Sequence, residues 1–482
     1  KNRESIHIEN SQIYRKKKQV DCVMKSRKNR EQYKRAIIFL ISFLLLVVLV
    51  ALFGLIWYRS YAGIIIQPFF RKGNWLVIGV YALLLYIFTR LYGGYRIGFF
   101  KRAEVIYSAV LSTLMVNTVT YLQISLIGRR FMDLRPLAAM SVCDMGVIIL
   151  WALTADKAYR KIFPPHKMLL VYGGRSAEKL ILKMNTRFDK YDICQAIHIS
   201  EGLEYIFSCI DRFEAVVICD VKAKTRNCIL KYCYARSIRA YLTPKISDTI
   251  IRGADVIHLF DTPLLLCSGQ GLTFEQRFAK RLLDITASLI ALALLWPFML
   301  LIAAAIRLYD GGPILYRQTR LTLEGKSFQL YKFRSMRVNA EQESGPRLAQ
   351  RNDDRITPVG VLIRRFRLDE LPQMLNILKG DMSLVGPRPE RPEIAEMLES
   401  VMPEFAFRLK VKAGLTGYAQ VMGKYNTEAY DKLKLDLMYI EQYSLLLDLR
   451  LLLMTIKIIF LPGSTEGVEN DCLCSSSERS RK

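Results

Sequence analysis

The chain has 482 residues, 51% of them hydrophobic, with 70 lysines and arginines against 44 aspartates and glutamates. The formal charge of +26 suits nucleic acid or an anionic membrane surface, and several long apolar runs favour the membrane. The ten cysteines and four histidines form no CxxC pair and no His-Cys cluster, which argues against a structural zinc site and a disulfide framework.

The N-terminal third predicts a membrane anchor. Residues 1–35 are polar and basic, and we expect a cytoplasmic arm that lies against lipid headgroups. Four apolar segments follow, each close to the length that crosses a hydrocarbon core of about 30 Å. They are Ala36–Tyr58, Trp75–Leu91, Val105–Leu126 and Leu137–Leu153. The basic residues before the first segment place the N-terminus inside, and an even number of spans returns the chain to the cytoplasm. A helical core bundle of a soluble protein is the alternative.

Residues 166–270 predict a parallel α/β layer. His166–Tyr172 and Ala215–Cys219 are typical of buried strands, and a helix is expected from Ser176 to Met184. Gly173-Gly174 could cradle a nucleotide phosphate or form a plain strand-to-helix turn. The full G-x-G-x-x-G pattern is missing, which favours the plain turn.

A second kind of membrane segment is expected at Ile285–Ile306, an almost purely apolar run with Pro297 near its middle. By length it could span the bilayer, with a kink. The basic residues at both flanks favour two cytoplasmic ends, and Pro297 removes a backbone N–H group and clashes with the preceding turn. We therefore predict a re-entrant helical hairpin over residues 281–307.

Two further structural expectations concern the C-terminal part. Ile314–Gln318 and Phe328–Phe333 predict a strand pair, and Leu435–Ile459 predicts one apolar helix, either in the membrane interface or packed in a core. Residues 469–482 are a polar tail.

The chemistry is concentrated around two adjacent carboxylates, Asp369 and Glu370. Arginines flank them at 364, 365 and 367 before and at 388 after. The pattern predicts a helix that begins with Asp369 near its N-cap and ends at Gly380. Helix N-termini attract anions, and arginine forks match phosphate oxygens. The set is suited to phosphoryl transfer, although a surface capping arrangement would also produce it.

The neighbouring motifs make the interpretation more specific. They are Tyr331–Met336, Gly386–Pro389 and Gly414–Gly417. In this order and spacing, residues 274–468 resemble the bacterial sugar transferase family, the polyprenyl-phosphate phosphoglycosyl transferases with a single re-entrant membrane helix. The remainder resembles the long form of that family, which implies a four-helix transmembrane bundle, a Rossmann-like α/β cytoplasmic domain and a mainly α catalytic domain. Ala413, which stands where the family often has proline, is a departure from its pattern.

The resemblance also implies a reaction. A sugar-1-phosphate would pass from a UDP-sugar to undecaprenyl phosphate with release of UMP, through a covalent intermediate on Asp369. Glu370, together with Asp369, would hold Mg²⁺. Arg364 and Arg388 match phosphate-binding positions, and Lys332 and Arg334 are weaker candidates for that role.

The biological setting follows from the same resemblance. The step would initiate an exopolysaccharide, a capsule or an O-antigen-type glycan at a bacterial inner membrane, with the catalytic domain cytoplasmic and the lipid bilayer as a partner. The resemblance leaves room for a homodimer and implies no nucleic acid.

Three rival interpretations remain at this point. A nicotinamide-dependent dehydratase would need the glycine fingerprint that is absent here. A membrane scaffold would not require the carboxylates and arginines together, and a nucleic-acid module would gather its positive charge on one recognition element.

Overall fold

A computed structural model describes residues 31–65, 69, 71–174, 176–269, 271–338, 353, 355–423 and 427–459. Contacts divide the chain into two compact units, 1–243 and 244–482, which are described separately. Most of the basic arm predicted over residues 1–35 and the whole tail predicted over 469–482 lie outside the described residues.

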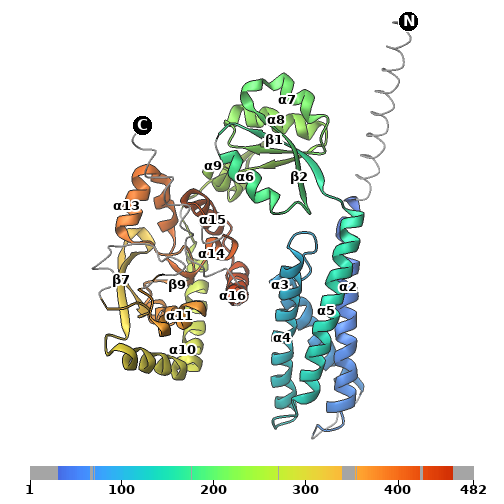
Figure 1. The fold of residues 1–482 in the computed structure, drawn as a ribbon, viewed down its shortest axis with the longest axis vertical. Coiled ribbons are helices and arrows are strands. Elements are labelled where there is room, and N and C mark those ends of the chain that lie inside the picture. The colour runs from blue at the N-terminus through green and yellow to red at the C-terminus, as the bar shows by residue number, and fades with distance from the viewer. Residues whose placement is uncertain are drawn as a thin grey trace. The chain divides into compact units, whose positions relative to one another are not determined.

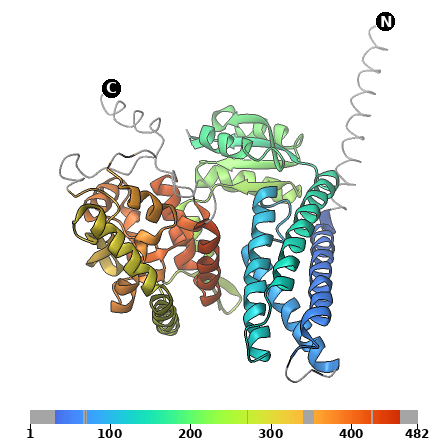
Figure 2. The same ribbon diagram turned by 60° about the horizontal axis from the view of Figure 1, so that its bottom comes forward.

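The first unit begins with a helical bundle that matches the four predicted membrane segments. Its elements are α2 (Lys34–Ile56), which continues into the π-helical η1 (Trp57–Tyr61), α3 (Arg71–Tyr92), α4 (Arg102–Ile127) and α5 (Arg135–Ile162). Figures 1 and 2 both show these helices side by side. Each contributes buried apolar residues to one core, whereas other leucines and isoleucines of the same helices are exposed. Helices that are apolar inside and outside, and long enough to cross a bilayer, indicate a membrane protein.

The α/β part of this unit contains one sheet of four parallel strands in the order β2-β1-β3-β4. The strands are β1 (His166–Tyr172), β2 (Tyr191–His198), β3 (Ala215–Cys219) and β4 (Arg239–Leu242). The helices are α6 (Ser176–Asn185), η2 (Ile199–Glu201), α7 (Leu203–Ile210) and α8 (Ala223–Ala235). Helices α7 and α8 cover one face of the sheet and α6 covers the other. The predicted parallel layer is confirmed.

The space beside the glycine turn after β1, at Gly173-Gly174, is occupied by other protein atoms. A Cβ atom on Gly174 would collide with the carboxylate of Asp220, the residue that follows β3. A carboxylate in this position repels a phosphate group. The arrangement favours the plain-turn interpretation of Gly173-Gly174 over a nucleotide cradle.

The boundary after the α/β layer differs from the expected one. We expected the domain to continue to residue 270, but the chain divides between Thr243 and Pro244. The reason is that α9 (Ile246–Arg252) packs on α15 of the second unit, where Gly253 lies close against Glu441. The hairpin of β5 (Asp255–Leu259) and β6 (Thr262–Leu266) follows α9.

The rest of the second unit contains one long helix, several shorter helices and two further strand pairs. The elements are α10 (Phe274–Asp310), β7 (Leu315–Leu321), η3 (Leu323–Gly325), β8 (Ser327–Phe333), α11 (Pro358–Arg365), η4 (Leu368–Glu370), α12 (Gln373–Lys379), β9 (Ser383–Val385), α13 (Pro392–Val401), η5 (Pro403–Lys410), β10 (Gly414–Thr416), α14 (Tyr418–Met422), α15 (Ala429–Glu441) and α16 (Leu445–Ile459). Strands β7 and β8 pair antiparallel, as predicted, and β9 pairs with β10 in parallel.

The long apolar helix α10 has 37 residues, with Pro297 inside it. Figure 1 shows that its two halves run in different directions. Its apolar part is mostly exposed, but Lys280 in the first half is buried and bonds to Asp448 at 2.6 Å. Arg281 donates to the carbonyls of Ile377 and Leu378. Lys280 and Arg281 therefore contribute to packing within the second unit. Their positive charges are for this reason weaker evidence that this end of α10 lies in the cytoplasm.

The single helix expected over Leu435–Ile459 is wrong, because α15 ends at Glu441 and α16 begins at Leu445. The side chain of Ser444 accepts a hydrogen bond from the backbone N–H of Leu447 at 3.1 Å, so it caps a new helix. Leu451 of α16 is fully buried in the core of the second unit, which favours the packed alternative over an interfacial helix.

Candidate active site

Asp369 and Glu370 lie in η4, a single 3₁₀ turn between α11 and α12. The predicted helix start at Asp369 is wrong, because α12 begins at Gln373. Arg367 adopts a left-handed conformation (φ 54°), which interrupts the helical path after α11 and begins the short turn. The predicted stop at Gly380 is confirmed, with φ 95° at this glycine.

Glu370 is held by two cations. It is buried, and its Oε1 atom accepts hydrogen bonds from Lys332 Nζ at 3.2 Å and from an Arg388 guanidinium nitrogen at 3.0 Å. Burial opposes ionisation, but the charges of Lys332 and Arg388 outweigh it and hold the pKa of Glu370 well below its usual range. Glu370 is therefore ionised at every physiological pH.

Asp369 is placed differently. It is half-buried, and within the described part of the chain its carboxylate has no hydrogen bond or ion pair. Burial, followed by the charge of Glu370, raises the pKa of Asp369, and Lys332, Arg364 and Arg388 only partly oppose this shift. The site thus contains one carboxylate paired with cations and one with unpaired oxygens.

The backbone around the site is fixed by buried polar side chains. Asn376 of α12 accepts from Tyr331 N at 3.0 Å and donates to Gln329 O at 2.7 Å, which joins α12 to β8. Asp284 of α10 accepts from Ser383 Oγ and Leu384 N, which fixes β9. These contacts position β8, which carries Lys332, α12, which follows the turn with Glu370, and β9, which precedes the loop with Arg388.

The glycine motifs pack backbone against backbone. A Cβ atom on Gly414 would collide with the backbone nitrogen of Gly386, and a Cβ on Gly417 would collide with the Gly386 carbonyl oxygen. Only glycine permits this approach. The loop that bears Arg388 therefore lies directly against β10.

Arg334 is not brought to the carboxylates. Its guanidinium is buried and pairs with Asp310 at the end of α10. Residues two apart on one strand point to the same side, but β8 ends at Phe333 and Arg334 lies beyond it, where its backbone N–H donates to Ile314 O at 2.9 Å. The structure thus places Lys332 at the site and Arg334 elsewhere.

Sequence reasoning missed two residues. A hollow beside Glu370 is lined by Arg320, Leu330, Lys332, Glu370, Gln373, Arg388, Pro389 and Gly414. Burial lowers the pKa of Arg320 to about 10, and its guanidinium donates to Pro389 O at 3.1 Å. The expected strand ended at Gln318, two residues too early to include Arg320. Gln373 is buried, and nothing in the sequence beyond its position in the expected helix marked it as a site residue.

The two carboxylates fit a magnesium ion. Among the described residues there is no cluster of three or more His, Cys, Asp or Glu side chains. Mg²⁺ does not need one, because it is typically bound by one or two carboxylates together with water and substrate phosphates. The unpaired oxygens of Asp369, next to Glu370, provide such ligands.

Comparison with known proteins assigns the family. Residues 275–462 match the family model described as bacterial sugar transferase. The chain is 40% identical over 235 residues to the UDP-N-acetylgalactosamine-undecaprenyl-phosphate N-acetylgalactosaminephosphotransferase of Aeromonas hydrophila, covering 48% of this chain and 54% of that protein. It is 45% identical over 184 residues to the UDP-glucose:undecaprenyl-phosphate glucose-1-phosphate transferase of Caulobacter vibrioides, covering 37% and 68%.

A further relative, the uncharacterized sugar transferase EpsL of Bacillus subtilis, is 40% identical over 190 residues, which are 39% of this chain and 90% of the relative. The match thus spans about half the length of the Aeromonas relative and nearly the whole of the Bacillus one. The chain belongs to the bacterial sugar transferase family.

Proposed function

We propose that the chain transfers a sugar-1-phosphate from a UDP-sugar to undecaprenyl phosphate, releases UMP, and so initiates a cell-surface glycan. The substrates named for the Aeromonas and Caulobacter relatives support these substrate classes. The observation that carries the proposal is the unequal state of the two carboxylates: Glu370 is paired with Lys332 and Arg388, and Asp369 is not.

In the first step Asp369 is the nucleophile. A carboxylate oxygen forms a bond to the sugar-proximal phosphorus of the donor, the bond from that phosphorus to the bridging oxygen breaks, and UMP leaves with the electron pair. Unpaired oxygens and a raised pKa support this role, because a carboxylate less stabilised by cations is the better nucleophile. Glu370, held by two cations, is less available for attack.

In the second step an oxygen of undecaprenyl phosphate attacks the same phosphorus, and Asp369 leaves as a free carboxylate. Arg388 and Lys332 are positioned to stabilise negative charge on the phosphoryl oxygens, with Arg364 near enough to act on the charge of Asp369. Mg²⁺ held by Asp369 and Glu370 would supply further neutralisation of charge on the diphosphate.

Membrane placement completes the proposal. We place the catalytic unit at the cytoplasmic face of a bacterial inner membrane, with α10 entering one leaflet and returning. The two halves of α10, a helix with Pro297 in its interior, run in different directions, which supports re-entry over a straight span. An acceptor with a lipid tail and a water-soluble donor would then meet at the membrane surface.

The test is UMP release by membranes that contain the protein, with undecaprenyl phosphate, Mg²⁺ and a panel of UDP-sugars. Wild type should release UMP with at least one donor, and Asp369→Asn, which keeps the size of the side chain, should not. A donor labelled in its sugar should also leave label on the wild-type protein when the acceptor is omitted. Turnover by Asp369→Asn at the wild-type rate would exclude the covalent step.

A further inference from the structure

The loop that carries Arg388 is held along its whole backbone. Four consecutive carbonyls accept hydrogen bonds: Pro387 O from Gly414 N, Arg388 O from Arg408, Pro389 O from Arg320 and Glu390 O from Leu321 N. The two prolines also limit rotation of the chain. A loop fixed in this way presents the Arg388 side chain in one direction, toward Glu370 at 3.0 Å.

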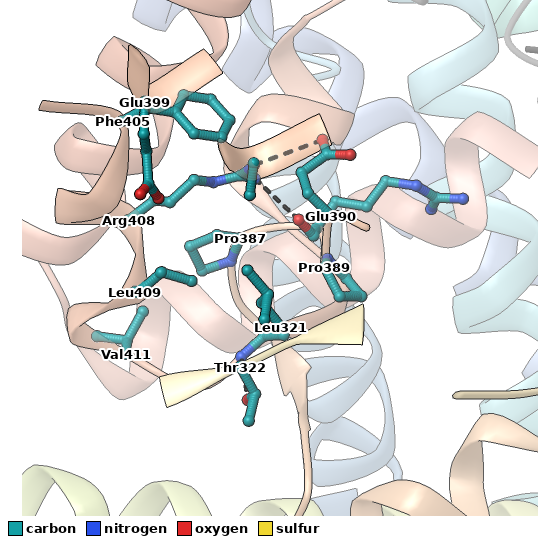
Figure 3. A pocket seen from close by; sticks show the side chains of 13 residues that line it. Leu321, Thr322, Pro387, Pro389, Glu390, Glu399, Phe405, Arg408, Leu409 and Val411 are labelled. Carbon is teal, nitrogen blue, oxygen red and sulfur yellow. Dashed lines mark hydrogen bonds and ion pairs between the residues drawn. The ribbon is translucent and has the colours of Figure 1, made fainter. Parts of the chain in front are cut away.

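The support for the Arg388 carbonyl comes from a buried charge network. Arg408 of η5 is 5% exposed and donates to Arg388 O at 2.9 Å. The same guanidinium lies 2.9 Å from Asp436 of α15 and 3.4 Å from Glu390. Figure 3 shows Arg408 reaching from the wall of a hollow toward Glu390, with Phe405 beside it. Asp436 is 1% exposed, so the pair is removed from water.

We propose that Arg408 and Asp436 are positioning residues of the active site, because their ion pair fixes the Arg388 carbonyl and thereby the direction of the Arg388 guanidinium. Neither residue lines the hollow beside Glu370. Their effect on catalysis passes through the loop. The inference rests on the proposed function, since it assigns these residues to the transfer reaction.

A purely structural role is the competing account, and physical chemistry separates the two. Removing one partner of a buried ion pair leaves an uncompensated charge and is strongly destabilising, whereas replacing both by apolar side chains of similar volume is often neutral or stabilising. A double apolar variant therefore retains stability. It cannot donate a hydrogen bond to Arg388 O.

The experiment compares wild type, the double variant Arg408→Met/Asp436→Leu and the single variant Arg408→Lys in the UMP-release assay, with thermal unfolding measured on each. The double variant should unfold near the wild-type temperature and lose at least tenfold in kcat/KM for the UDP-sugar. Arg408→Lys keeps a positive charge beside Asp436 but lacks the guanidinium fork that also reaches Arg388 O. Its kcat/KM should therefore also fall. The control is Arg236→Met/Asp211→Leu, an exposed ion pair of the α/β layer.

If the wild-type protein is active, and either Arg408→Lys or the double variant has the same kcat/KM, the positioning role is overturned. The proposed function then still stands. A wild type that is inactive with every donor would overturn both. If the double variant does not fold, the result for Arg408→Lys decides.

Discussion

Arg388 and Glu370 form a hydrogen-bonded ion pair at 3.0 Å, in which Arg388 donates to the same carboxylate oxygen that accepts from Lys332. The charge of Glu370 is thus balanced before any substrate arrives. Asp369, one residue earlier, has no such partner within the described chain. The two neighbouring carboxylates therefore differ chemically, because Glu370 is paired with cations and Asp369 is not.

Replacing Arg388 by lysine tests whether the site needs the planar, two-pronged geometry of the guanidinium or only its positive charge. Arg388→Lys keeps the charge, but an ammonium group cannot bind a phosphate and Glu370 in a bidentate manner. We expect kcat/KM for the UDP-sugar to fall by about 10- to 100-fold, the equivalent of one charged hydrogen bond of about 1.5–3 kcal/mol. Arg365→Lys, at an exposed position of α11, is the matched control. Equal activity of Arg388→Lys and wild type would show that only the charge matters.

Replacing Glu370 tests the metal assignment. Glu370→Gln retains the size of the side chain but removes one of the two proposed anionic ligands, so the Mg²⁺ concentration for half-maximal activity should rise several-fold. Part of the lost turnover should return in excess Mg²⁺. Titration of activity with MgCl₂ in wild type and variant is the measurement. An unchanged Mg²⁺ requirement would exclude Glu370 as a ligand.

The raised pKa of Asp369 predicts an acid limb in the pH profile. The proposed attack by Asp369 needs its ionised carboxylate, so kcat/KM should fall as the pH drops through a value above the ordinary aspartate pKa of about 3.9. Because Lys332 lowers this pKa, the residual activity of Lys332→Met should show a limb at higher pH. Glu324→Gln, at an exposed turn, should leave the limb in place. A limb in Lys332→Met at the wild-type position or lower would contradict Asp369 as its source.

The path of α10 is testable with single cysteines in a background free of reactive thiols. Arg277→Cys and Leu308→Cys lie at exposed positions on either side of the apolar run. With both ends cytoplasmic, neither should react with an impermeant reagent in intact cells, and both should react after lysis. Pro297→Leu removes the cause of the bend and should favour external labelling of Leu308→Cys. External labelling of one position in the unaltered helix would exclude re-entry.

The contact between glycines predicts a local stability effect. In Gly414→Ala the new methyl group would collide with the Gly386 backbone, and we expect a loss of about 1–3 kcal/mol in the free energy of unfolding. Activity should fall as well, because Gly386 lies two residues before Arg388. Gly79→Ala, where a Cβ meets no atom within 4 Å, is the control. Unfolding by denaturant, followed by fluorescence, measures both variants.

Much of the fold was predictable because its signals are local. Apolar runs of membrane length gave the bundle, and Ala215–Cys219, apolar throughout, gave a strand buried at every position. The break before Leu445 escaped prediction because the apolar pattern continues through it, while a single serine cap decides where the new helix begins.

The site was predictable in its residue types but not in its pairings. Lys332 and Glu370 are separated by 38 positions and Glu370 and Arg388 by 18, and their meeting depends on how Asn376 and Asp284 join α12, β8 and β9. No local pattern encodes such contacts.

Helix α10 connects the proposed membrane contact to the elements that position the candidate site. Its apolar stretch is the most exposed of the candidate membrane helices among the described residues. Its first half holds α12 through Arg281 and β9 through Asp284, and these two elements lie in the chain between the carboxylates of η4 and the Arg388 loop. With α10 in the membrane as proposed, we expect a tilt imposed on it by thicker or thinner lipid to be transmitted to these elements. Rate constants measured in membranes should then vary with lipid thickness and differ from those measured in detergent.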